Sequence, residues 1–130
     1  MKVLSLSIKQ KYFEDIVAGI KKDEFREIRP NNAARYVYYK ADGKEYKDGA
    51  DIPEDAQDVD VLPIQYDALK LITGEYKGKR PFIIIEVKDS EVQFLTDEYD
   101  NDIVYEYEGE EYLASQIRYG LGTIIEKSDV

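Results

Sequence analysis

Residues 21–26 place Lys21, Glu24 and Arg26 directly after an amphipathic segment that ends at Gly19. An Arg side chain offers a planar fork to a phosphate or a base carbonyl, and a carboxylate accepts from an exocyclic amine. A desolvated Lys beside another cation has a lowered pKa and can act as a base or nucleophile. The spacing therefore indicates a site for an anionic or nucleotide-like ligand. The alternative is a solvent-facing ladder in which Glu24 pairs with Arg26 or with a neighbouring strand.

Composition narrows the chemistry that is open to such a site. The 130 residues contain no Cys and no His, which excludes disulfides, zinc-thiolate sites, thiol catalysis and every His-dependent nucleophile or metal site. Carboxylates, Lys, Tyr and Ser or Thr hydroxyls remain as catalytic groups. We expect no cofactor and no metal. The acidic run at 97–102 lacks the Gly and the ligand spacing of a calcium loop.

Charge is distributed unevenly along the chain. The net charge is −10, but residues 1–40 hold nine Lys or Arg against five Asp or Glu, and residues 41–130 hold nine against twenty-three. An acidic total repels a polyanion at long range, so a local basic surface suits a small anionic ligand better than a duplex. The acidic remainder is a possible surface for a basic protein partner. The sequence shows neither an apolar stretch of membrane-spanning length nor a signal peptide, and we expect a cytoplasmic protein without membrane contact.

The elements that must position the three side chains follow from periodicity. Residues 3–8 alternate as a strand, and residues 9–18 have helical spacing, with an expected buried stripe of Tyr12, Phe13, Ile16, Val17 and Ile20. Gly19 ends this helix. Residues 22–28 then form a strand that turns Phe25 to the core and Glu24 and Arg26 to the other face.

The rest of the chain predicts a small mixed β-barrel in a single domain. We expect a strand at 34–40 whose Tyr36 and Tyr38 share a face, where Tyr38 could stack a base. An acidic loop insertion follows at 41–60, then a helix at 62–74 and a basic turn with Lys79 and Arg80. A strand at 81–87, hairpin strands on either side of 97–102, a short helix within 108–120 and a strand at 121–127 complete the chain. The predicted fold class is α+β, a partly closed barrel of about six strands with two main helices at its mouth.

Gly19-x-Lys21-x-x-Glu24-x-Arg26 resembles the signature of the ASCH domain family, a branch of the PUA-like β-barrels. The segment from Tyr66 to Gly74, followed by Lys79-Arg80-Pro81, is similar to the family's second helix and the strand after it. The resemblance implies a cleft beside the first helix that takes RNA or a modified nucleotide. With the residues above, the expected ligand-binding set is Lys21, Glu24, Arg26, Tyr38, Lys79 and Arg80.

The same resemblance implies a second expectation, that of an enzyme. Some small bacterial relatives are amidohydrolases that remove the acyl group of acetylated cytidine with a Lys, a Thr and a Glu. The Lys matches Lys21, whereas Glu24 occupies the position of the Thr in this sequence. Lys21 and Glu24 are therefore the catalytic candidates of the enzyme hypothesis. A third hypothesis, from another class, is an acidic protein-interaction module.

Overall fold

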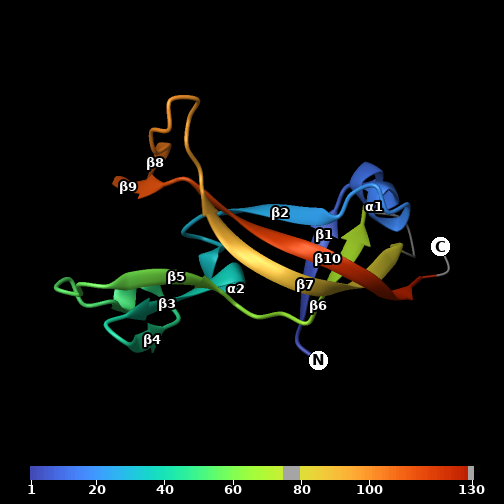
Figure 1. The fold of residues 1–130 in the computed structure, drawn as a ribbon, viewed down its shortest axis with the longest axis horizontal. Coiled ribbons are helices and arrows are strands. Elements are labelled where there is room, and N and C mark those ends of the chain that lie inside the picture. Colours follow the sequence, from blue (N-terminus) through green and yellow to red (C-terminus); the bar gives the residue numbers. More distant parts are fainter. Residues whose placement is uncertain (75–79, 129–130) are drawn as a thin grey trace. The chain divides into compact units, whose positions relative to one another are not determined.

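The computed structural model describes residues 1–74 and 80–128, and it is mostly β-sheet with two α-helices (Figure 1). Contacts within the chain divide it into two compact units. The first unit comprises Met1–Glu24, Gln65–Ser90 and Tyr119–Val130, and the second comprises Phe25–Ile64 and Glu91–Arg118. Three of the four boundaries between the units fall within strands, namely β2, β7 and β10, whose bounds are given next, and the fourth lies between β5 and β6.

The elements follow one another along the chain in the order β1 (Val3–Ile8), α1 (Gln10–Val17), β2 (Asp23–Ile28), α2 (Ala33–Tyr36), β3 (Val37–Ala41), β4 (Lys44–Tyr46), the 3-10 turn η1 (Gly49–Asp51), β5 (Val59–Pro63), β6 (Ala68–Thr73), β7 (Phe82–Phe94), β8 (Val104–Tyr107), β9 (Glu110–Leu113) and β10 (Ser115–Lys127). The largest sheet has the strand order β1-β6-β7-β10-β2.

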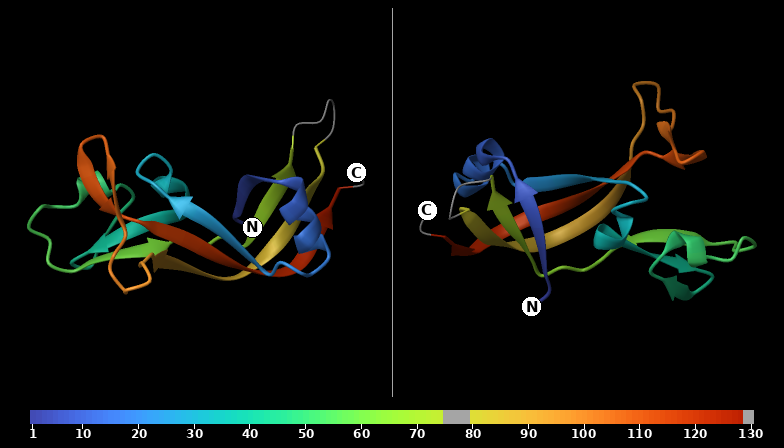
Figure 2. Two further views of the ribbon diagram at one scale, coloured as in Figure 1. Left: turned by 90° about the horizontal axis from the view of Figure 1, so that it is seen from above. Right: turned by 180° about the vertical axis from the view of Figure 1, so that it is seen from behind.

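The first unit is built on the pairing of β1 with its neighbours in that sheet. β1 runs parallel to β6 and β6 runs antiparallel to β7, so β6 lies between the other two strands (Figure 2). Alternate side chains on these strands face the core, as the period of a strand requires. The buried set from this unit is Leu4, Leu6, Ile8, Phe13, Ile16, Ala68, Leu69, Leu71, Ile83, Ile85, Tyr119 and Leu121.

Helix α1 ends as the sequence predicts, and its ending directs the chain toward Lys21. Gly19 has φ of +77°, and its N–H donates to the carbonyl of Ile16 at 3.0 Å. The N–H of Ile20 donates to the carbonyl of Asp15 at 2.9 Å, which completes a Schellman motif. The Lys21 N–H also donates to Asp15, at 3.0 Å, so the backbone of Lys21 is held against the helix end.

The second unit contains a small sheet and a hairpin. Its three-stranded sheet has the order β4-β3-β5, and β8 pairs with β9. Asp42 and Gly43 connect β3 to β4 with φ values of 49° and 86°, and Glu108 and Gly109 connect β8 to β9 with 50° and 82°. Two consecutive residues with positive φ are typical of type I′ turns, whose twist suits a two-residue hairpin connection.

Two predicted helices are wrong. The segment predicted as a helix at 62–74 holds the end of β5 and all of β6, and the short helix predicted within 108–120 is β9 followed by the start of β10. In both segments the buried side chains alternate, as with Leu69, Leu71 and Thr73 on β6 and Ile117 and Tyr119 on β10. A short apolar run is compatible with a helix or with a strand, and pairing with neighbouring strands decides which of the two forms.

Three smaller predictions also need correction. The strand expected at 34–40 begins as the one-turn helix α2 and becomes β3 only at Val37. The strands expected on either side of 97–102 are joined by the isolated bridge Thr96↔Asp102 and not by a strand ladder, and β8 pairs with β9 instead. The acidic insertion at 41–60 contains β4, η1 and the start of β5. Within residues 1–74 and 80–128 no sheet closes on itself, so the barrel remains a prediction.

Candidate functional site

Lys21 and Glu24 form an ion pair at the bend between α1 and β2. The Lys21 Nζ lies 3.7 Å from the Glu24 Oε1, and the two side chains are 23% and 7% exposed. Tyr12, which is 44% exposed on α1, places its ring centroid 5.5 Å from the same Nζ, within cation–π range. An amine, a carboxylate and an aromatic ring therefore meet at one end of the helix.

The face that β2 turns inward is the opposite of the predicted one. Glu24 and Ile28 are buried, whereas Phe25 is 42% exposed, so the expectation that Phe25 packs in the core is wrong. Strand alternation couples all of these positions, since a shift of one residue moves every side chain to the other face. The inward face of β2 therefore carries the carboxylate of Glu24 as well as the apolar side chain of Ile28. A charge is costly to bury without a partner, and Lys21 supplies one.

The exposed positions of α1 also differ from the predicted stripe. Phe13 and Ile16 are buried as expected, but Tyr12 is 44% exposed and Ile20 is 75% exposed. The sequence analysis therefore assigned Tyr12 to the core and missed its place beside Lys21. The signal that could have found it is the helix end itself, because the Schellman turn returns the chain to Asp15, which lies three positions, or about one turn, after Tyr12.

Two predicted ligand-binding residues lie in the second unit. Arg26 is half-buried on β2 and shares strand parity with Glu24, and its part in the site remains a prediction. Tyr38 is half-buried on β3, opposite Leu62 of β5. Tyr36 lies on α2 and is buried, so the prediction that Tyr36 and Tyr38 share a strand face is wrong.

The predicted basic turn is described only in part. The Nε of Arg80 donates to the backbone carbonyl of Thr73 at 3.0 Å and also to that of Gly74, so this side chain is bound to the backbone at the end of β6. Lys79 lies outside the described residues. A contribution of either side chain to ligand binding stays a prediction.

The hydroxyl of Thr73 has a structural role. Thr73 is fully buried, and its Oγ1 donates to the carbonyl of Pro81 at 3.1 Å. This hydroxyl therefore ties β6 to the residue before β7. A hydroxyl that already donates its proton inside the protein is poorly placed to act as a nucleophile, for which a nearby base must take that proton.

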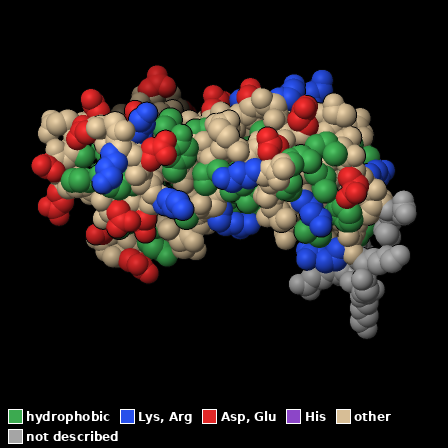
Figure 3. All heavy atoms as spheres, turned by 90° about the horizontal axis from the view of Figure 1, so that it is seen from below, with side chains coloured by type: hydrophobic (Ala, Val, Ile, Leu, Met, Phe, Trp, Pro, Cys, Tyr) green, Lys and Arg blue, Asp and Glu red, His purple; other side chains and the backbone are tan. Residues whose placement is uncertain are grey.

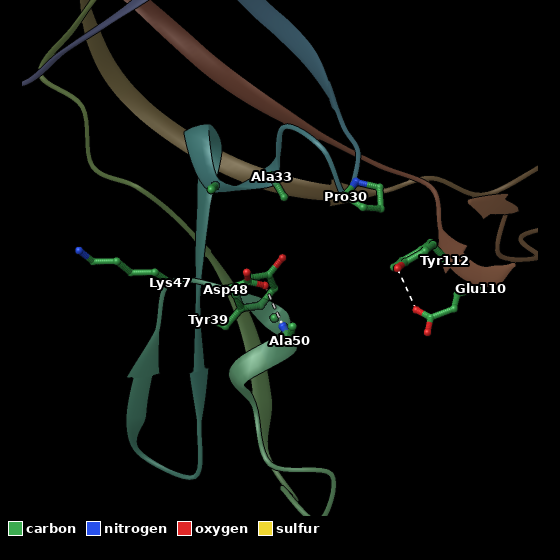
Figure 4. A pocket seen from close by; sticks show the side chains of 10 residues that line it. Pro30, Ala33, Tyr39, Lys47, Asp48, Ala50, Glu110 and Tyr112 are labelled. Carbon is green, nitrogen blue, oxygen red and sulfur yellow. Dashed lines mark hydrogen bonds between the residues drawn. The ribbon is translucent and has the colours of Figure 1, made fainter. Parts of the chain in front are cut away.

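The second unit contains a pocket that the sequence analysis did not predict. Its volume is about 470 Å³, and two tyrosines, Tyr39 on β3 and Tyr112 on β9, contribute to its lining (Figure 4). The first unit has a more open pocket of about 590 Å³ lined in part by Tyr66, Asp67 and Glu86. Neither pocket is lined by the ion pair at the end of α1.

No family model, curated protein or solved structure matches the chain. Within the described ranges, 1–74 and 80–128, no three Asp or Glu side chains are grouped so that they could hold a metal ion. In the same ranges no helix has both the length and the apolar character that crossing a membrane requires.

Proposed function

We propose that the chain is a nucleotide- or RNA-binding domain of the ASCH type, with a PUA-like fold, whose ligand contacts the cluster of Lys21, Glu24 and Tyr12. The ion pair between Lys21 and Glu24 is the observation that carries the proposal, because both residues belong to the sequence motif and lie together at the bend after α1. The mixed sheet, with β1 parallel to β6 and β6 antiparallel to β7, is compatible with such a fold.

Each group in the cluster has a recognisable task. The Lys21 amine is partly exposed and can bind a phosphate or an acyl or base carbonyl. The Glu24 carboxylate, whose side chain is only 7% exposed, lies behind this amine and would orient it toward the ligand. The exposed ring of Tyr12 provides an aromatic surface of the kind on which unpaired bases stack. Together these groups favour a single-stranded or mononucleotide ligand over a duplex.

The charge of each unit supports placing this ligand on the first one. The first unit holds eleven Lys or Arg against ten Asp or Glu, which gives +1, whereas the second holds seven against eighteen, which gives −11. A phosphate approaches a nearly neutral surface with a local lysine far more readily than a strongly acidic one.

Binding of a fluorescent single-stranded RNA of about eight nucleotides tests the proposal. We expect affinity that falls with rising salt, since phosphate contacts release counterions, and that drops about three- to tenfold in Lys21→Ala. Lys22→Ala is the matched control, because Lys22 is the exposed neighbour with the same charge. Equal losses in both variants would indicate only a general charge effect and would contradict the assigned site.

The alternative function is an amidohydrolase acting on an acylated nucleoside. Lys21 and Glu24, which lie together after α1, are the two groups that this reaction would use, with Lys21 as the general base. Incubation with acetylated cytidine should then release acetate, and Lys21→Ala should abolish the release. Binding of acetylated cytidine without any release of acetate would leave the binding function and exclude the enzyme.

A further inference from the structure

The pocket of the second unit has two aromatic and acidic walls. Tyr39 and Asp48 lie on one side and Tyr112 and Glu110 on the other, with Ala50 next to Asp48 (Figure 4). The cavity measures about 470 Å³, within the range of small-ligand sites. Both walls come from the second unit, although Asp48 and Glu110 are separated by more than sixty positions along the chain.

Internal contacts hold the groups on both walls in place. The Asp48 Oδ1 accepts from the Ala50 N–H at 2.9 Å, which fixes the carboxylate at the start of η1. The Tyr112 hydroxyl donates to the Glu110 Oε2 at 3.0 Å. A Cβ at Gly49 would lie 3.5 Å from the Tyr39 ring, so this ring packs directly on the turn. A preorganised pocket loses less entropy when a ligand binds.

The electrostatics of the pocket are negative at Tyr39. Partial burial raises the pKa of the Tyr39 hydroxyl, and the neighbouring negative charge of Asp48 raises it further. Hydrogen bonding to Glu110 likewise raises the pKa of the Tyr112 hydroxyl. Both phenols are therefore neutral at pH 7, and the charges on the two walls are those of the carboxylates.

Lysine is the one cationic residue type in the lining. Lys47 extends away from Tyr39 and Asp48 and from the opposite wall in Figure 4. The space between the walls is thus bordered by tyrosine rings and carboxylates. Such a set of groups suits a cation, since aromatic faces attract positive charge and carboxylates complement it.

The same unit already binds a guanidinium in this manner. The Cζ of Arg29 lies 4.6 Å from the centroid of the Tyr105 ring, and its Nη2 lies 2.8 Å from the Glu27 Oε1. Tyr105 is in turn stacked on Tyr112, with ring centroids 5.8 Å apart and planes at 25°. A tyrosine face and a carboxylate therefore hold an Arg side chain beside the ring that lines the pocket.

The charge of the second unit indicates where the cation comes from. The unit carries seven Lys or Arg against eighteen Asp or Glu. Acidic side chains gather around the β3–β5 sheet at the left of the face drawn in Figure 3. A field of this sign draws in basic polypeptides and raises their rate of association, and it extends well beyond the pocket.

We propose that this pocket binds the side chain of an arginine or lysine presented by a basic partner polypeptide. The alkyl stem would pack on Tyr39 and Tyr112 while the charged head lies between the carboxylates of Asp48 and Glu110. This inference concerns residues different from those of the proposed nucleotide site, so each can fail without the other.

Titration of the full chain with n-butylguanidinium, followed by backbone amide NMR, tests the pocket. We expect a dissociation constant on the order of 1–10 mM and shifts centred on the amides of Gly49, Ala50 and Tyr112. Butyramide and butyrate, of similar length, should bind at least tenfold more weakly. Equal binding of the neutral or the anionic probe would overturn the assignment of a cation site.

Charge-neutralising variants identify the residues responsible. Asp48→Asn and Glu110→Gln keep an acceptor oxygen for Ala50 and Tyr112, so the fold should persist. Each should weaken butylguanidinium binding about two- to fivefold, as expected for ion pairs with exposed carboxylates. Glu111→Gln is the control, because Glu111 is the next residue on β9 and faces the other side. An equal loss in the control would contradict the proposal.

A basic peptide tests whether the pocket binds a side chain of a partner polypeptide or a free small cation. The peptide Gly-Arg-Gly-Lys-Gly-Arg-Gly should bind more tightly than butylguanidinium, cause the same shifts, and weaken as salt rises. Replacing its basic residues with Gln should abolish binding. Butylguanidinium binding with no peptide binding would assign the pocket to a free small cation and refute the partner polypeptide.

Discussion

The carboxylate of Glu24 is more buried than the amine of Lys21 that lies 3.7 Å away, with side-chain exposures of 7% and 23%. The pair thus has an inner and an outer member. The outer amine can reach a ligand while the inner carboxylate orients it from behind. This asymmetry underlies both the proposed binding function and the stability of the bend after α1.

A double-mutant cycle measures how strongly the pair is coupled. Glu24→Gln and Lys21→Met should each lower the free energy of unfolding, and the coupling between them should be about 0.5–2 kcal/mol. Glu24→Gln should lower the free energy of unfolding by the larger amount, about 1–3 kcal/mol, because Glu24 is the more buried residue. Urea unfolding monitored by circular dichroism measures the free energy of unfolding of each variant. The cycle of Glu24→Gln with Lys22→Met should give a coupling near zero, and equal couplings would contradict a specific pair.

The Gly19 turn should be sensitive to a side chain. Gly19 has φ of +77°, where a Cβ is strained, and nothing within 4 Å would obstruct an added Cβ. Gly19→Ala should therefore cost about 1–2 kcal/mol through backbone conformation alone. Gly19→Asn should cost less, because Asn tolerates this region better. Chemical unfolding of the two variants compares them, and a larger loss for Asn would refute the conformational explanation.

Acid should weaken the loop that Asp42 closes. The backbone N–H groups of Asp58 and Gln57 donate to the Asp42 carboxylate and hold its pKa below the usual 3.8. A depressed pKa stabilises the folded state fully above the unfolded value, and this contribution is lost as pH falls through the folded value. The thermal midpoint of the parent should thus decline more steeply below about pH 4 than that of Asp42→Asn. Asp55→Asn is an exposed, charge-matched control, and identical pH profiles for all three proteins would count against this account.

Local signals predicted the elements that position the ion pair. The alternation at residues 3–8 predicted β1, and the helical spacing after it predicted α1. Gly19 predicted the end of this helix. The proximity of Lys21 to Glu24 follows from their separation of three positions at a bend. These features depend on neighbours in the sequence, and such features can be read from one chain.

Features that depend on distant pairing could not be predicted in this way. The segment of β6 resembles a helix until its pairing with β1 and β7 is known. The outward direction of Phe25 depends on the register of β2, which a shift of one residue would reverse. The tyrosine pocket is lined by residues of η1 and of the β8–β9 hairpin. No pattern in the sequence of either segment indicates that the two lie close together.

A nucleotide titration followed by backbone amide NMR tests the central claim most directly. With cytidine monophosphate or acetylcytidine as the ligand, we predict shifts concentrated at residues 19–24 and at Tyr12, which disappear in Lys21→Ala and persist in Lys22→Ala. Shifts that avoid the end of α1, or no shifts at millimolar ligand, would contradict a nucleotide site built on Lys21 and Glu24.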